Sequence, residues 1–226
     1  MHLKCTKGDR ENMFCVIFDM DGTLLDTQSI CVPAWEYAGK KQGVSGMGDC
    51  IPHVCGMNEG GWTAYLNQNY GALDASQFKQ DLRTYILENG NVTYKKGAEA
   101  CLSFLKEKGI RMALASGSSH GSIRHHLSEV GALDIFDVVV GGQDVENGKP
   151  APDIFLLAAK KLGADPKDCF VLEDSENGIR AGHAAGMQCI GIPDVAPFSE
   201  EAKALMTACL SSMDEAIKIF EKMISE

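Results

Sequence analysis

The sequence predicts an α/β fold, a doubly wound parallel sheet with a small α-helical cap domain inserted after its first strand. Short apolar runs alternate with amphipathic segments along most of the chain, which is the order produced by a parallel sheet covered with helices. The runs are apolar on both faces, as strands buried on both sides of a sheet are. The stretch 28–92 breaks this rhythm, because it carries helical patterns and no comparable apolar run.

The strands of the predicted sheet are short, and the first of them is 13–18, with the sequence MFCVIF. A chain of 226 residues with 45% hydrophobic composition can bury a core around such strands. The remaining predicted strands are 110–115, 136–140, 169–172, 188–192 and, shorter than the others, 207–210.

Helices are expected between and after these strands, at 97–108, 152–162, 175–185 and 212–224. A glycine directly follows each of the first three, which is typical of a helix C-terminus. The second begins with a proline and the third with a serine, which are both favoured at helix starts. The last opens with Ser-x-x-Glu, the pattern of a capping box.

The insertion divides the chain into two predicted domains. The core comprises 1–27 and 93–226, and the helical cap comprises 28–92. Helical patterns in the cap lie near 31–41, 62–69 and 78–88, and glycine-rich segments join them at 43–48 and 56–61.

Composition and charge exclude several classes of partner. The net charge of −10, from 31 acidic and 21 basic residues, disfavours both nucleic acid and anionic lipid as partners. No run of 18 apolar residues occurs and the first twelve residues lack a signal-peptide pattern, so we expect no membrane span and a cytoplasmic protein. A monomer is expected, because the core and the cap can cover each other.

The sequence FDMDGT places two carboxylates, Asp19 and Asp21, where the first apolar strand ends. In open α/β sheets, ligands bind outside the carboxyl ends of the strands. Side chains two residues apart on a strand point the same way, so one carboxylate could attack a substrate while the other handles a proton. Taken alone, the motif could also be an ordinary turn after a strand.

Polar groups follow three other predicted strands as well. Ser116 and the backbone at Gly117 could hold phosphate oxygens, and Lys149 could neutralise the charge of a phosphoryl group. Glu173 and Asp174 are oxygen ligands suited to a hard cation such as Mg²⁺. Each motif alone could be a helix cap or a solvated loop, but four such clusters at four strand ends favour a single catalytic site.

These motifs together resemble those of a known family. DMDGTLLDT, the Ser116 motif, KPAPD and LEDSENGIRAG look like the four ordered motifs of the haloacid dehalogenase superfamily, whose core is Rossmann-like. The chain is similar to the beta-phosphoglucomutase-like and sugar-phosphatase-like members, which carry a helical cap between motifs one and two. The resemblance covers about 14–192.

The resemblance implies catalytic roles for the first motif. Asp19 would attack phosphorus and become an aspartyl-phosphate. Asp21 would protonate the leaving oxygen and then activate water. Dehalogenases and phosphonatases of this fold differ at the position of Asp21, so its carboxylate points to phosphate esters.

The resemblance also implies binding roles. Ser116 and the backbone around Gly117 would hold phosphoryl oxygens, and Lys149 would offset charge on the nucleophile and the phosphoryl group. Asp174, with Glu173 nearby, would bind Mg²⁺ together with the Asp19 carboxylate and the Asp21 backbone carbonyl.

Phosphatase and mutase activities differ in what the cap must hold, because a mutase must retain a second phosphate. The resembled mutases use a cap arginine shortly after a glycine and a cap histidine after the Asp-Thr that follows motif one. Neither appears here, in 57–61 after Gly56 or in 28–32 after Thr27, and the acidic Glu59 would repel a phosphate. We therefore predict a Mg²⁺-dependent phosphatase of a small phosphorylated metabolite, with a beta-phosphoglucomutase-type mutase as the alternative.

Two further expectations concern the cap and a non-enzymatic alternative. Asn58, Glu59 and Trp62 are the candidate substrate contacts in the cap, although Trp62 also suits the interior of the cap. A protein of this fold could instead bind a phosphorylated ligand without turnover, but the intact set of catalytic residues argues against that reading.

Overall fold

The computed structural model describes residues 14–54, 57–71 and 73–225. Its centre is a six-stranded sheet with the order β3-β2-β1-β4-β5-β6, in which every neighbouring pair is parallel. The predicted fold class is thereby confirmed. The strands are β1 (Cys15–Phe18), β2 (Met112–Ala115), β3 (Val138–Val140), β4 (Cys169–Glu173), β5 (Gln188–Gly191) and β6 (Ala208–Cys209).

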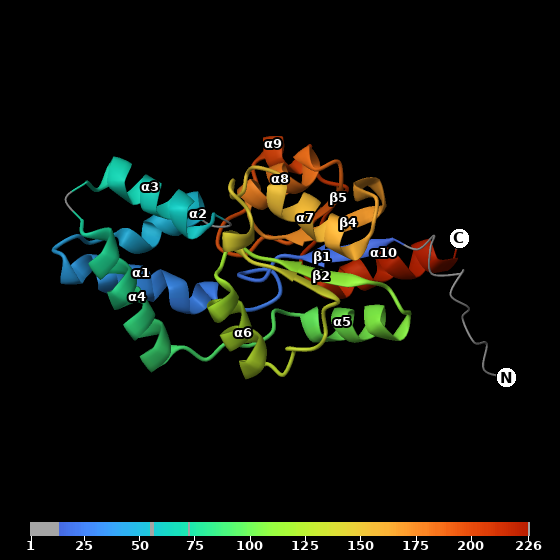
Figure 1. Cartoon of the computed structure of the whole chain (residues 1–226), viewed down its shortest axis with the longest axis horizontal. Coiled ribbons are helices and arrows are strands. Elements are labelled where there is room, and N and C mark those ends of the chain that lie inside the picture. The colour runs from blue at the N-terminus through green and yellow to red at the C-terminus, as the bar shows by residue number, and fades with distance from the viewer. Residues whose placement is uncertain (1–13, 55–56, 72, 226) are drawn as a thin grey trace.

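Helices cover both faces of the sheet (Figure 1). Successive residues of β1 alternate between the two faces, so Val16 and Phe18 join one apolar cluster while Cys15 and Ile17 join the other. The first face is covered by α5 (Ala98–Glu107), α6 (His120–Glu129) and α10 (Met213–Ser225). The second face is covered by α7 (Asp153–Leu162), α8 (Glu176–Ala184) and α9 (Glu200–Lys203). Short 3₁₀ turns lie at Gly142–Asp144 and Pro166–Asp168.

The helices of the predicted cap lie to one side of the sheet and have an apolar cluster of their own (Figure 1). Trp35 is central to this cluster, since its ring packs against the rings of Phe78 and Trp62, with 5.2 and 5.8 Å between ring centroids. The elements are α1 (Gln28–Lys41), a 3₁₀ turn at Met47–Cys50, α2 (Ile51–Val54), α3 (Glu59–Asn69) and α4 (Ala75–Asn89). The sequence patterns did not indicate the turn or α2. We keep the name cap for 28–92, and the domain boundaries stay a prediction.

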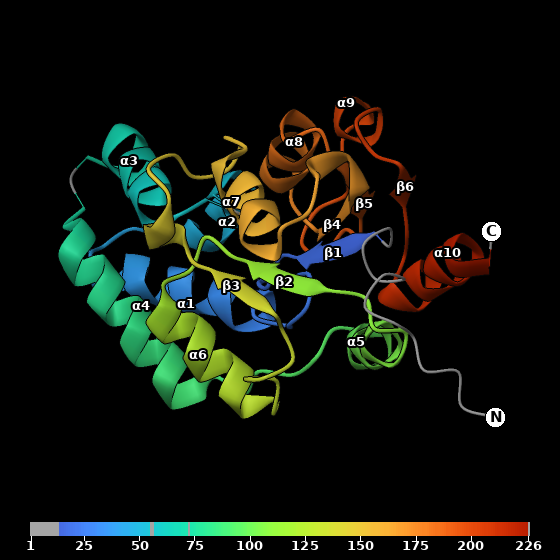
Figure 2. The same cartoon turned by 45° about the vertical axis from the view of Figure 1, so that its right-hand side comes forward.

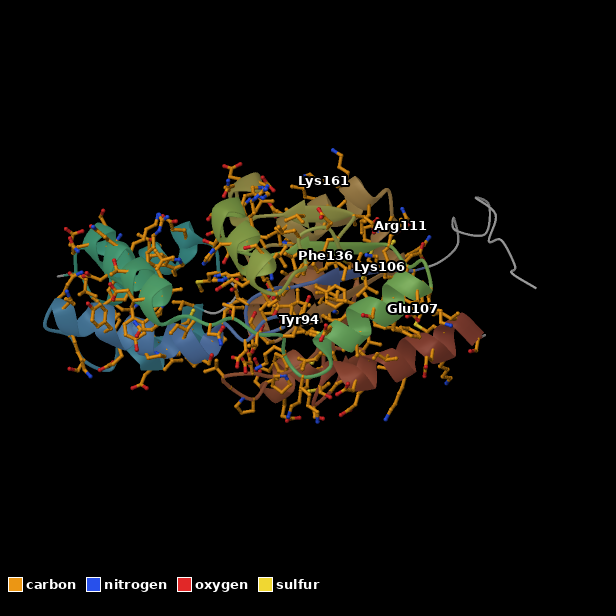
Figure 3. The ribbon with its side chains drawn as sticks, turned by 90° about the horizontal axis from the view of Figure 1, so that it is seen from below. Tyr94, Lys106, Glu107, Arg111, Phe136 and Lys161 are labelled. Atoms are coloured by element: carbon orange, nitrogen blue, oxygen red, sulfur yellow. The ribbon has the colours of Figure 1, made fainter. Side chains whose placement is uncertain are left out.

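The two connections between the cap and the core run side by side. The amide of Asp26 donates a hydrogen bond to the carbonyl of Thr93 at 2.8 Å, and Leu25 forms an antiparallel bridge with Tyr94. Figure 3 shows Tyr94 in the segment that leads from the cap back into the core. The cap is therefore an excursion whose two ends are fixed to each other.

The sheet order indicates where a ligand would bind. From β1 the chain moves outward through β2 to β3, and then in the opposite direction through β4 to β6 (Figure 2). Ligands bind at the carboxyl ends of the strands where the order reverses, which here is between β1 and β4. Within the described ranges, no helix is long and apolar enough to cross a membrane.

Candidate active site

Asp19 lies at the end of β1, in the middle of the sheet. Its amide donates to the carbonyl of Leu172 at 3.0 Å, which extends the pairing of β1 with β4 by one residue. Its side chain is buried and Oδ1 accepts a hydrogen bond from Nζ of Lys149 at 2.6 Å. The sheet and the lysine together hold this carboxylate at the carboxyl end of β1.

Lys149 is buried among hydrogen-bond acceptors. Besides Asp19, its ammonium contacts Oε1 of Glu173 at 2.7 Å and the carbonyl of Ala115 at 3.4 Å. Burial acts to lower the pKa of Lys149, but the carboxylates of Asp19 and Glu173 outweigh it and raise the pKa above its ordinary value. The lysine is therefore a fixed positive charge at the ends of β1 and β4.

Glu173 has a partner for each of its carboxylate oxygens. Oε1 accepts from Lys149, and Oε2 accepts from both the amide of Ser175 at 2.7 Å and its hydroxyl at 2.9 Å. The hydroxyl of Ser175 also caps α8 by accepting from the amide of Gly178 at 3.1 Å. This network fixes the orientation of Glu173 towards the lysine.

Asp174 is held by the turn that follows Asp19. The hydroxyl of Thr23 donates to Oδ1 of Asp174 at 2.8 Å. Gly22 has a φ of +86°, and a Cβ there would lie 2.4 Å from Oδ2 of Asp174. The glycine is thus required by its backbone conformation and by the close approach of the carboxylate. Thr23 was not among the predicted site residues.

Asp21 is bound by two serines of the loop after β2. Its Oδ2 accepts from the hydroxyl of Ser118 at 2.8 Å and from that of Ser116 at 3.1 Å. The amide of Ser118 in turn donates to Oγ of Ser116 at 3.0 Å. Ser118 was not predicted, although its place two residues after Ser116 in a loop at a strand end was a usable signal.

Three buried carboxyl groups, those of Asp19, Glu173 and Asp174, offer oxygens within 4.8 Å of one another. Burial raises the pKa of Asp19 to about 8, although Lys149 acts in the opposite direction. Burial and the neighbouring carboxylates raise the pKa of Asp174 well above its ordinary value. A hard divalent cation with oxygen ligands, such as Mg²⁺, would offset this concentration of negative charge, so the donor set fits such an ion.

The three candidate cap residues occupy different surroundings. Asn58 caps the N-terminus of α3 and lies against loops of the core. Glu59 is exposed and forms an ion pair with Lys79 at 2.6 Å, and Trp62 packs within the cap. The cap glycine invoked in the mutase comparison, Gly56, lies outside the described residues.

A cavity of about 250 Å³ opens beside Asp174 between the cap and the core. From the cap, α2 contributes Pro52 and His53 to its wall, and His53 stacks on Tyr65 with 5.9 Å between ring centroids. His53 was not among the predicted site residues, because a single histidine without a partner motif carries no signal. The core side of the cavity is formed by Asp174, Ser175, Glu176, Val195, Ala196, Pro197 and Phe198.

Comparison with known proteins identifies the family of the chain. The family model described as haloacid dehalogenase-like hydrolase matches residues 14–186. The fructose-1-phosphate phosphatase YqaB of Escherichia coli is 32% identical over 185 residues, which is 78% of this chain and 95% of the relative.

Two solved structures share the fold over nearly the whole chain. One from Thermotoga maritima, provisionally named for a beta-phosphoglucomutase, has a TM-score of 0.72 and 27% identity and covers 93% of this chain and 99% of its own. The other is a family hydrolase from Deinococcus radiodurans with bound phosphate and sodium, with a TM-score of 0.70, 28% identity and coverages of 90% and 93%.

Proposed function

The chain belongs to the haloacid dehalogenase-like hydrolases, and we propose that it is a Mg²⁺-dependent phosphatase of a small phosphorylated metabolite. The observation that carries this proposal is the pair of Asp19 and Asp21 at the end of β1. The first is bound to a buried lysine and the second to two serine hydroxyls. This arrangement supplies a nucleophile, a proton donor and a fixed positive charge at one place.

The proposed reaction proceeds in two displacements at phosphorus. In the first, a carboxylate oxygen of Asp19 bonds to phosphorus while the ester oxygen leaves and takes a proton from Asp21. In the second, Asp21 takes a proton from a water molecule that attacks phosphorus, which releases inorganic phosphate and restores Asp19. Lys149 stabilises the charge that develops on the phosphoryl oxygens throughout.

Mg²⁺ would be held by the carboxylates of Asp19 and Asp174 and by the backbone carbonyl of Asp21. When bound, it supplies positive charge that offsets the negative charge of the phosphoryl group. Glu173 uses both of its oxygens on Lys149 and Ser175, which favours a role in orienting the lysine. A direct contact between Glu173 and the metal stays a prediction.

The proposed substrate class is a phosphosugar or a similar phosphate monoester. The cavity of about 250 Å³ beside Asp174 suits a small organic group, and a curated relative is named for fructose 1-phosphate. A mutase is the second candidate, because structural neighbours are provisionally named for that activity. Against it, the segment 57–61 contains no basic residue that could hold a second phosphate, and it contains the acidic Glu59.

The test is an assay of phosphate release from a panel of phosphate monoesters, with and without Mg²⁺. We expect release that requires the metal and that falls by at least about a thousandfold in Asp19→Asn, since the nucleophile is lost. If no ester is hydrolysed and a sugar phosphate is isomerised in the presence of a bisphosphate, the mutase is correct and the phosphatase is not. The monomeric state, the cytoplasmic location and the substrate contacts of Glu59 and Trp62 stay predictions.

A further inference from the structure

Three glycines from two connections of the core, one after β2 and one after β3, face the same point of the cap. A Cβ on Gly148 would lie 2.7 Å from both Cγ and Nδ2 of Asn58, and one on Gly142 would lie 3.1 Å from Cβ of Asn58. A Cβ on Gly117 would lie 2.7 Å from the carbonyl oxygen of Met57 and 3.2 Å from the amide of Asn58. We call these three glycines the glycine socket.

Glycine is needed at the three socket positions because there is no room for a side chain, and not because of the backbone conformation. None of Gly117, Gly142 and Gly148 has a positive φ, so the backbone at each position is one that other residues adopt. At Gly117 and Gly148, what excludes a side chain is the backbone of the cap or the side chain of Asn58. At Gly142, the nearest atom to the Cβ position is the carbonyl oxygen of Gly117 in the core, at 2.2 Å, and Asn58 lies farther away.

Asn58 is held rigidly where it meets the socket. It is the N-cap of α3, and its Oδ1 accepts a hydrogen bond from the amide of Gly61 at 2.9 Å. Because this bond fixes the side-chain amide relative to the helix, the amide cannot turn away from the core without uncapping α3. The position of the whole helix is thereby tied to the socket.

Two of the three socket glycines belong to loops that carry proposed catalytic residues. Gly117 lies between Ser116 and Ser118, the two serines that bind the Asp21 carboxylate. Gly148 directly precedes Lys149, the buried partner of the proposed nucleophile. A cap seated in the socket therefore presses on the loop that holds the proton donor and on the loop that carries the lysine.

We propose that Asn58 is a positioning residue, which seats the cap in the glycine socket and thereby holds the Ser116 loop and the Lys149 loop in their catalytic arrangement. This inference rests on the proposed phosphatase function for its kinetic readout. It gives Asn58 a role through the core loops instead of through a contact with the substrate. A closed site with a seated cap also excludes water from the reacting groups.

The main test uses Gly148→Ala and a second change that should relieve it. The three nearest atoms to the added methyl group all belong to the Asn58 side chain, so Gly148→Ala should overpack the contact and destabilise the seated cap. We therefore expect kcat/KM to fall by about tenfold or more. Asn58→Ser keeps an N-cap hydroxyl for α3 but removes the clashing amide. The double variant should therefore recover to the level of Asn58→Ser alone.

Two matched glycine variants separate this effect from a general effect of alanine. Gly60 lies in the first turn of α3, two residues after Asn58. The methyl group added in Gly60→Ala would lie at an ordinary 3.6 Å from Oδ1 of Asn58, so this variant should keep wild-type activity. Gly117→Ala meets the backbone of Met57 and not a removable side chain. Its loss of activity should persist when Asn58→Ser is added.

The outcomes that overturn the proposal are distinct. A double variant as poor as Gly148→Ala would place the defect in the Lys149 loop itself. A change in the ranking of esters by Asn58→Ser, in place of one common factor, would make Asn58 a substrate contact. If the wild type hydrolyses no ester, the phosphatase proposal fails, and amide hydrogen exchange still tests the socket. Asn58→Ser should then speed exchange in 116–118 and 147–149, and unchanged exchange would refute the seating role.

Discussion

Two ion pairs of similar length, one in the core and one on the cap, stand in opposite surroundings. Lys149 and Asp19 meet at 2.6 Å with side chains that are 1% and 4% exposed. Lys79 and Glu59 also meet at 2.6 Å, but their side chains are 53% and 57% exposed. Because water screens the second pair and not the first, distance alone does not determine what an ion pair contributes to stability. The comparison predicts that the same substitution has very different effects in the two regions.

The largest contrast is expected between Lys149→Met and Lys79→Met. Removing the buried lysine leaves Asp19 and Glu173 without their cation, which should cost about 3–5 kcal/mol of the free energy of unfolding. Removing the exposed lysine should cost less than about 1 kcal/mol. Urea denaturation followed by circular dichroism measures both. Equal losses in the two variants would show that burial does not separate the two pairs.

A cation should stabilise the core region selectively. Mg²⁺ that binds the folded state alone adds about 2.7 kcal/mol at one hundred times its dissociation constant, which appears as a rise in Tm. Asp174→Asn should abolish this rise, because it removes one of the proposed ligands. Asp144→Asn, which changes an acidic residue of the core outside the buried carboxyl cluster, should keep the rise in Tm. A rise that survives in Asp174→Asn would place the cation elsewhere.

Two helical glycines extend the comparison from charge to packing. A Cβ on Gly178 of α8 would lie 1.8 Å from Oε1 of Glu173, so Gly178→Ala should destabilise the core by about 1–3 kcal/mol through overpacking. Gly60→Ala in the cap meets nothing closer than 3.6 Å and should cause no loss, since alanine favours helix. Thermal unfolding of both variants checks this, and a neutral Gly178→Ala would mean that Glu173 moves freely.

The smallest effect is expected from an intermediate case, Asp144, whose side chain is 22% exposed. Burial acts to raise its pKa, but the Gly141 amide, the His120 ring and Lys161 hold it below the ordinary value. The unfolded state therefore binds more protons in acid, so the contribution is present near neutral pH and is lost as pH falls below about 4. The difference in unfolding free energy between wild type and Asp144→Asn should shrink over that range, and a constant difference would contradict the assignment.

The grouping of the core side chains at one edge of the sheet was predictable, because these residues break a local pattern. Asp19, Asp21, Glu173 and Asp174 follow apolar strands directly, where a charge is costly unless something compensates it. A parallel sheet then brings such strand ends to one edge whatever the loops between them do. Thr23 escaped prediction, since a hydroxyl after a strand is unremarkable in any turn.

The cap was less predictable for a physical reason. Its helix α2 is four residues long, which is too short to show a hydrophobic period. The neighbours of Asn58 come from two core loops that are distant from it in sequence, so no local pattern describes them. The cap residues find their surroundings only when the two regions meet, and no spacing within the sequence encodes that meeting.

The adjacent connections of the cap have an evolutionary consequence. The bond between Asp26 and Thr93 joins the two ends of the insertion, so the chain leaves the core and returns to it at one place. The entropy of closing such a loop grows slowly with its length. Insertions of another size could therefore be exchanged at this junction with little effect on the folding of the sheet. Selectivity could then diversify while the reacting groups stay unchanged.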